Sequence, residues 1–140
     1  MRVVLDANIF ASALMSPQGA PARVVTLVLQ QRLYDLVMTS DILEEIRRVL
    51  FYPKIRKKIT GSDEELNFWV DALMIISHCC EPRYHHEIIV HEDPDDDKYI
   101  IAALESHASY LISGDQHLLK LNKQQNVKIV SPQEFLTHLT

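Results

Sequence analysis

The feature that most restricts the fold is the alternation of short, continuously apolar segments with longer amphipathic ones. Segment 3–5 (VVL) is apolar throughout, which is typical of a strand buried on both faces of a sheet. Segment 40–50 (SDILEEIRRVL) repeats apolar residues at helical spacing, with Ser40 as the predicted N-cap and Glu44 or Glu45 in reach for a capping box. Strands that alternate with helices in this way favour an α/β fold around a mainly parallel sheet.

The same patterns predict the other elements and a single domain. The predicted strands are 3–5, 34–39, 87–91, 109–113 and 127–131. The predicted helices are 8–14, 21–31, 40–50, a helix opening at the N-cap Ser62, 97–107 and a helix opening at Pro132. The length of 140 residues is enough for one compact core and too short for two independent ones, so we expect one domain over 1–140.

The sequence argues against a membrane protein and against a protein stabilised by disulfide bonds. No apolar run approaches the roughly 20 residues that span a bilayer. The first residues do not form a signal-peptide pattern, so we expect a cytoplasmic protein with no membrane partner. Cys79 and Cys80 are adjacent and form no CxxC pattern. We therefore expect both on a buried strand as small apolar residues, and no structural zinc site.

The net charge of −5 argues, taken alone, against a nucleic-acid partner. Segment 47–58 is an exception because it carries six of the 14 basic residues, with Phe51 and Tyr52 among them. We expect this stretch to hold a nucleic-acid backbone, and its alternative interpretation is a solvated, mobile loop. The basic residues concerned are Arg47, Arg48, Lys54, Arg56, Lys57 and Lys58.

Carboxylates follow four of the predicted strands. They are Asp6, Glu45, the neighbours Asp96 and Asp97, and Asp115. Ligands of open parallel sheets bind beyond the carboxyl ends of the strands, so these side chains are expected to meet at one edge. Each has a simpler interpretation by itself, as a turn residue, a helix-start acid, a surface residue or a cap. Asn8 is expected to be either a partner of Asp6 or an N-cap.

Clustered carboxylates require a cation or must take up protons. Hard oxygen ligands of this kind suit Mg²⁺ or Mn²⁺. One ion activates water and neutralises a phosphoryl group, and two ions about 3.5–4 Å apart hold the attacking and leaving oxygens of an in-line displacement. The pattern therefore predicts a phosphodiester substrate and leaves the number of ions open.

Five segments match a known family in order: VVLDANIFASAL, SDILEEIRRVL, DPDDDKYIIAAL, ASYLISGDQHLLKL and VKIVSPQEFL. Together they cover nearly the whole chain and resemble PIN domains, more narrowly the VapC-like group of toxin components. The resemblance implies a PIN-like α/β/α sandwich and a ribonuclease that cleaves single-stranded RNA with water activated by Mg²⁺ or Mn²⁺. It also implies a cognate antitoxin that blocks the site, and a homodimer.

The resemblance also assigns four catalytic, metal-binding carboxylates in this sequence: Asp6, Glu45, Asp97 and Asp115. The choice of Asp97 depends on its spacing to Ile100 and to the last acid, and Asp96 stays open as the alternative ligand. Asn8 and Ser113 match polar positions that the family places near the metal.

Two other protein classes share an acidic α/β site. A receiver domain requires two adjacent acids after the first strand and a Lys after the fifth, whereas the first strand here is followed by DAN. A flap-type nuclease requires arch segments for which this chain has no room. A catalytically silent PIN-like scaffold, acting through protein or RNA binding, stays open as the alternative, and metal binding is the discriminating observation.

Overall fold

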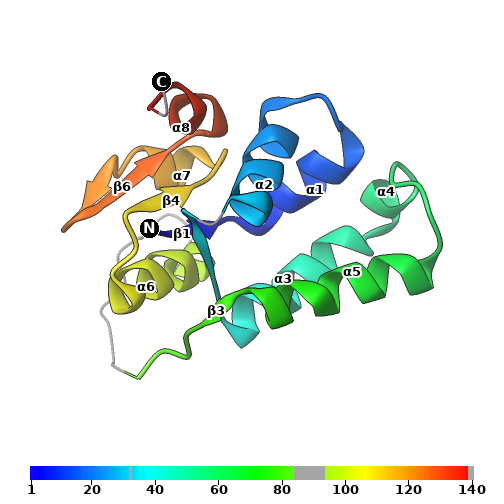
Figure 1. Cartoon of the computed structure of the whole chain (residues 1–140), viewed down its shortest axis with the longest axis horizontal. Helices are drawn as coiled ribbons and strands as arrows, with labels where there is room; N and C mark the ends of the chain where they lie inside the picture. Colours follow the sequence, from blue (N-terminus) through cyan, green and yellow to red (C-terminus); the bar gives the residue numbers. More distant parts are fainter. Residues whose placement is uncertain (32, 84–93, 139–140) are drawn as a thin grey trace.

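The computed structural model describes residues 1–31, 33–83 and 94–138, which form a six-stranded sheet with helices on both faces (Figure 1). The strands are β1 (Arg2–Leu5), β2 (Asp35–Met38), β3 (His78–Cys79), β4 (Tyr110–Ile112), β5 (Lys123–Gln124) and β6 (Val127–Val130). The helices are α1 (Ala7–Met15), α2 (Ala20–Gln30), α3 (Ser40–Leu50), α4 (Pro53–Arg56), α5 (Asp63–Ile76), α6 (Asp97–Ser106), α7 (Gln116–Leu119) and α8 (Pro132–His138), and a 3-10 turn, η1 (Pro94–Asp96), precedes α6.

The sheet has the strand order β3-β2-β1-β4-β6-β5. Every neighbouring pair is parallel except β5 and β6, which are antiparallel. The predicted α/β fold with a mainly parallel sheet is therefore confirmed. Since β1 lies between β2 and β4, the residue that follows β1 lies at the middle of the carboxyl edge of the sheet.

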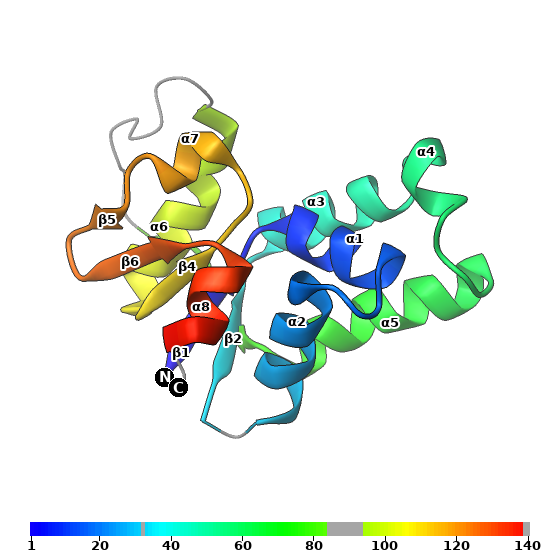
Figure 2. The same ribbon diagram turned by 90° about the horizontal axis from the view of Figure 1, so that it is seen from above.

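Helices cover the two faces of the sheet in a layered arrangement. Helix α6 packs against β1, β2 and β4 on one face, whereas α2 and α8 contact each other on the opposite face (Figure 1). Helices α3, α4 and α5 extend away from the sheet as a helical arm (Figure 2), in which α3 packs against α5 (Figure 1). Within the described ranges, no helix is both long and apolar enough to cross a membrane.

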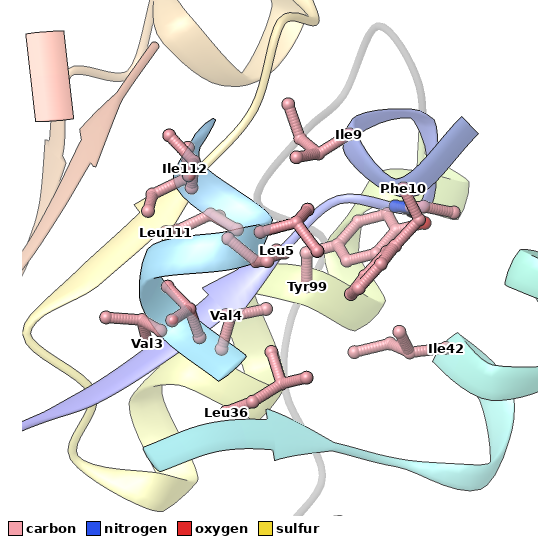
Figure 3. Close-up of a cluster of buried hydrophobic side chains, with 14 of the residues drawn as sticks. Val3, Val4, Leu5, Ile9, Phe10, Leu36, Ile42, Tyr99, Leu111 and Ile112 are labelled. Atoms are coloured by element: carbon pink, nitrogen blue, oxygen red, sulfur yellow. Dashed lines mark hydrogen bonds between the residues drawn. The ribbon is translucent and has the colours of Figure 1, made fainter. Parts of the chain in front are cut away.

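The core is centred on β1, whose residues Val3, Val4 and Leu5 are all buried. This burial explains why segment 3–5 is apolar without alternation, because helices cover both faces of its strand. Figure 3 shows Leu5 together with Phe10 of α1 and Tyr99 of α6, so the core brings the starts of these two helices close to the end of β1.

Helix α3 has the predicted bounds but not the predicted cap. Its N-cap is Thr39, whose Oγ1 accepts a hydrogen bond from the Ile42 backbone N–H at 3.1 Å. The predictions of Ser40 as the cap and of a capping box were therefore wrong. Ser40 is the first helical residue, and both its N–H and its hydroxyl donate to Glu81 Oε1 at 2.7 Å.

Most other predicted elements are confirmed within a residue or two. Ser62 caps α5 in a capping box with Glu65, and Pro132 begins α8. The predicted strand 87–91 lies outside the described residues. The short elements α4, β3, β5 and η1 were not predicted, whereas α7 is the segment that Asp115 was expected to cap if it acted as a cap.

The two cysteines were placed wrongly by the sequence analysis. Cys79 lies on β3, the two-residue strand at the edge of the sheet, and it is exposed, while Cys80 follows it and is half-buried. Both are free thiols. An apolar dipeptide alone does not distinguish an exposed edge from a buried strand, because composition carries no information on strand order.

Candidate metal centre

Asp6 is a buried carboxylate at the carboxyl end of the central strand. It is 2% exposed and is the N-cap of α1, where its Oδ1 accepts a hydrogen bond from the Asn8 backbone N–H at 3.2 Å. Its Oδ2 accepts a hydrogen bond from the Ser113 hydroxyl at 2.7 Å. Asn8 therefore meets Asp6 through its backbone, and the alternative that Asn8 is the N-cap was wrong.

Ser113 connects two of the predicted site residues. It is fully buried just beyond β4, and its Oγ also accepts a hydrogen bond from the Asp115 backbone N–H at 2.9 Å. Asp115 in turn caps α7, because its Oδ1 accepts from the His117 N–H at 2.8 Å. The segment after β4 is thus tied to the end of β1, as expected for neighbouring parallel strands.

The electrostatics of Asp6 show that several carboxylates lie close together. Burial raises the pKa of the Asp6 carboxyl above its ordinary value. Hydrogen bonds from Ser113 and Asn8 oppose this rise, whereas the negative charges of Glu45 and Asp115 add to it. An ionised Asp6 in this position is unfavourable unless a positive charge compensates it.

Glu45 reaches the same region from the helical arm through Tyr99. The buried Tyr99 hydroxyl donates to Glu45 Oε2 at 2.6 Å and accepts from the Ala7 backbone N–H at 3.3 Å. Burial raises the pKa of this hydroxyl, and the charges of Asp6 and Glu45 raise it further, so Tyr99 stays a donor. Lys98 Nζ lies 2.7 Å from the same Glu45 oxygen.

Asp96 and Asp97 are both buried at the start of α6, with 8% and 7% exposure. Within the described part of the chain, one group of three potential ligand atoms lies within 4.8 Å of one another, and it comprises Asp96, Asp115 and His117. Asp97, which was preferred as a ligand from its spacing, is not part of this group. This grouping supports Asp96, the last residue of η1 directly before α6, as the alternative ligand beside Asp115.

Of the neighbours of these carboxylates, sequence analysis missed Lys98, Tyr99 and His117. Lys98 and Tyr99 follow directly after Asp97, within a motif that was already singled out. Their contacts with Glu45 join residues more than 50 positions apart and depend on how α6 packs against α3. The one indication in the sequence was Tyr99 itself, because the hydroxyl of a tyrosine that becomes buried beside an acidic motif usually requires a hydrogen-bond partner.

Tyr99→Phe is expected to weaken both the fold and the site. The change removes the donor to Glu45 and leaves the buried Ala7 N–H without its acceptor, which costs about 1–3 kcal/mol in the free energy of unfolding. Urea denaturation in EDTA measures this loss. Tyr110→Phe is the matched control, since Tyr110 belongs to β4 and lies at the opposite edge of the sheet. Equal losses in the two variants would contradict the assigned role.

The six predicted RNA-binding residues divide into two groups. Arg47 donates to Asn67 and Asp71 of α5, and Arg56 donates to Asp63 and to the Ile59 and Gly61 carbonyls. These two arginines therefore join helices of the arm. The other four are exposed, and within the described ranges none of them forms an ion pair: Arg48, Lys54, Lys57 and Lys58.

The donor atoms of this region fit a hard divalent cation. Asp6, Glu45 and Asp115 offer carboxylate oxygens, and so does the Asp96–Asp97 pair at the start of α6. Mg²⁺ and Mn²⁺ prefer such ligands, and a cation would compensate both the burial and the neighbouring negative charges that raise the pKa of Asp6. The chemistry of the residues is therefore consistent with the predicted metal.

Comparison with known proteins bears on the fold and the family. The chain is 30% identical over 144 residues to an uncharacterised protein of Methanocaldococcus jannaschii, MJ1680, covering 97% of this chain and 90% of the relative. It is also similar to a chain in the crystal structure of VapBC2 from Rickettsia felis bound to a DNA fragment from their promoter. That likeness has a TM-score of 0.60 at 13% identity and covers 94% of this chain and 98% of the other. Residues 2–117 match the model of the PIN domain, and the chain therefore belongs to the PIN domain family.

Proposed function

We propose that this protein is an endoribonuclease that cleaves single-stranded RNA and depends on Mg²⁺ or Mn²⁺. The observation that carries the proposal is the buried Asp6 carboxylate, whose pKa is raised by burial and by the charges of Glu45 and Asp115. Such a cluster is unfavourable for folding by itself, so its presence indicates a functional use. Membership of the PIN family supports hydrolysis of a phosphodiester as that use.

Each residue of the proposed centre has a defined task. Asp6, Glu45 and Asp115, with Asp97 or Asp96, would hold the metal, and Ser113 orients Asp6 and Asp115 through its two hydrogen bonds. When bound, Mg²⁺ or Mn²⁺ supplies activation of water and neutralisation of charge on the phosphodiester. The backbone and side-chain contacts of Asp6 hold its two oxygens in fixed directions, which reduces the reorganisation required during the reaction.

The proposal includes a biological setting. We infer that the protein is the toxin of a toxin–antitoxin pair, that it acts in the cytoplasm as a homodimer, and that a cognate antitoxin protein blocks its site. The fold shared with the Rickettsia felis VapBC2 structure supports this setting. Co-expression with the product of a neighbouring gene, followed by measurement of the mass of the complex, tests it independently of catalysis.

RNA cleavage tests the proposed activity directly. A mixed single-stranded RNA is incubated with the protein in Mg²⁺, in Mn²⁺ and in EDTA, and a single-stranded DNA of the same sequence serves as the comparison substrate. The proposal expects cleavage of RNA with either metal and none in EDTA. Measurable Mn²⁺ binding without cleavage of any RNA would instead favour a catalytically silent scaffold.

The exposed basic residues are expected to bind the RNA backbone. Residue Leu50 ends α3 five positions after Glu45, roughly 7.5 Å along the helix axis, so the basic stretch continues from the proposed centre. Each contact with a phosphate adds about 0.7 to the steepness with which the logarithm of the RNA-binding constant falls with the logarithm of the salt concentration. Replacing Arg48, Lys54, Lys57 and Lys58 together by Gln should therefore make this slope shallower by up to roughly 3. Fluorescence anisotropy in EDTA measures binding without cleavage.

The matched control for this prediction replaces two exposed lysines elsewhere. Lys123 and Lys128 lie on β5 and β6, away from the helical arm. Their replacement by Gln should leave the salt slope close to that of the wild type, because β5 and β6 lie on the other side of the molecule from the arm (Figure 2). An unchanged slope in the four-residue variant would show that RNA binds to a different surface.

A further inference from the structure

Lys98 brings a positive charge into the carboxylate cluster from within the chain. Its Nζ lies 2.7 Å from Glu45 Oε2, and the two side chains are only 21% and 23% exposed. Water therefore screens this pair less than it screens a surface ion pair. The Tyr99 hydroxyl donates to the same oxygen, so a hydrogen bond and an ion pair converge on one atom of the Glu45 carboxylate.

The Lys98 ammonium neutralises the charge of Glu45, as a bound metal cation would. The negative charge of Glu45 repels the ionised Asp6 carboxylate. The Lys98 ammonium, which pairs with Glu45, offsets part of this repulsion. The Lys98 ammonium also lies 5.9 Å from the centroid of the Tyr99 ring, which is within the range of a cation–π contact. Lys98 is thus in contact both with the Glu45 carboxylate and with Tyr99, the residue whose hydroxyl donates to that carboxylate.

We propose that Lys98 is a built-in counter-ion, which occupies Glu45 in the metal-free protein and competes with the divalent cation for it. The inference rests on the proposed metal centre and goes beyond it by assigning a residue that sets the metal affinity. The ammonium stabilises the clustered carboxylates before metal arrives, and it must give up Glu45 or repel the incoming ion when metal binds. Lys98 is a positioning residue in this account, because it acts through Glu45.

The sign of the effect on metal binding follows from the charges. A residue that only oriented Glu45 would raise the metal affinity, so its removal would weaken binding. A competing cation lowers the affinity, so its removal tightens binding. Two positive charges a few ångströms apart in a partly buried site repel strongly enough to change an affinity by roughly tenfold or more.

Mn²⁺ titration of the purified protein tests the proposal without any use of cleavage. Lys98→Met keeps the aliphatic stem and removes the charge, and it is expected to bind Mn²⁺ roughly tenfold more tightly than the wild type. Lys98→Arg keeps the charge and should bind with nearly wild-type affinity. Lys98→Gln provides the same comparison if Lys98→Met does not fold. Lys128→Met is the matched control, because Lys128 pairs with Tyr110 at the opposite edge of the sheet.

A double-mutant cycle shows whether Lys98 acts through Glu45. In a Glu45→Gln background, Lys98→Met should tighten Mn²⁺ binding less than half as much as it does in the wild type, on a logarithmic scale. Equal or weaker Mn²⁺ binding by Lys98→Met, beside a wild type that binds, would overturn the counter-ion proposal alone. Failure of every variant and of the wild type to bind Mn²⁺ would overturn the proposed metal centre and this inference with it.

Discussion

Replacing Asp6 by Asn is expected to abolish metal-dependent RNA cleavage, with a loss of at least roughly a thousandfold. The estimate follows because a bound metal supplies several kcal/mol of transition-state stabilisation, and each 1.4 kcal/mol corresponds to a factor of ten. Asn retains a side-chain oxygen that can accept the hydrogen bond from Ser113 or Asn8, so the fold should persist. Single-turnover cleavage of RNA in Mn²⁺ measures the activity, and circular dichroism checks the fold.

The same substitution should stabilise the metal-free protein at neutral pH. Burial raises the pKa of Asp6 in the folded state above its ordinary value of 3.8, so the folded protein binds this proton more tightly than the unfolded chain does. Its contribution to stability is therefore complete below pH 3.8 and is lost as the pH rises through the folded-state pKa. In EDTA at neutral pH, Asp6→Asn should unfold at a higher urea concentration than the wild type, and the difference should shrink in acid.

The control for both effects is Asp35→Asn. Asp35 is exposed and begins β2, so it lies at the amino edge of the sheet, opposite to the proposed centre. This variant should keep full activity and show no gain in stability. If Asp6→Asn cleaved RNA at the wild-type rate, or if it were less stable than the wild type in EDTA, the assignment of Asp6 as a strained metal ligand would be wrong.

Phe10→Ala is expected to cause the largest loss of stability. Phe10 is fully buried on α1 and contacts Trp69 of α5 edge-on, with ring centroids 6.1 Å apart. Truncation leaves a cavity between the sheet and the helical arm, at a cost of about 3–5 kcal/mol. Since domains of this kind are stable by about 5–15 kcal/mol, much of the folded population could be lost.

Urea denaturation in EDTA measures the effect of Phe10→Ala, and Phe10→Leu is its matched control. Leu fills most of the space beside Trp69, so we expect a clearly smaller loss than for Ala. A loss below about 1 kcal/mol for Phe10→Ala would contradict the account, because it would mean that the arm does not depend on this contact.

The parts of the fold that depend on local sequence were predictable. A run of apolar residues such as 3–5 identifies a buried strand, and the spacing of apolar residues in 40–50 identifies α3. The cap of α3 was missed because Ser is intrinsically the better N-cap residue, so sequence preference favours Ser40 over Thr39. The helix nevertheless begins at Ser40, directly after Thr39, because β2 ends at Met38. Cys79 was missed because its exposure depends on strand order rather than on composition.

The candidate centre was predictable where topology alone decides the position. Asp6 and Ser113 directly follow the neighbouring parallel strands β1 and β4. Because the carboxyl ends of parallel strands lie at the same edge of the sheet, the two side chains are expected to be close together. The contacts of Lys98 and Tyr99 with Glu45 depend instead on how α6 packs between the sheet and α3. No periodicity or motif in one sequence specifies such a packing angle, so these residues were identified only in the structure.

The anomalous scattering of Mn²⁺ soaked into a crystal of the wild type would locate the metal and its ligands. The account predicts an anomalous peak with Asp6 and Glu45 among its ligands, at roughly the 2.0–2.2 Å expected for hard cations with carboxylate oxygens. A peak at Asp96, Asp115 and His117 alone, with Asp6 still bound only to Ser113 and Asn8, would contradict the proposed centre.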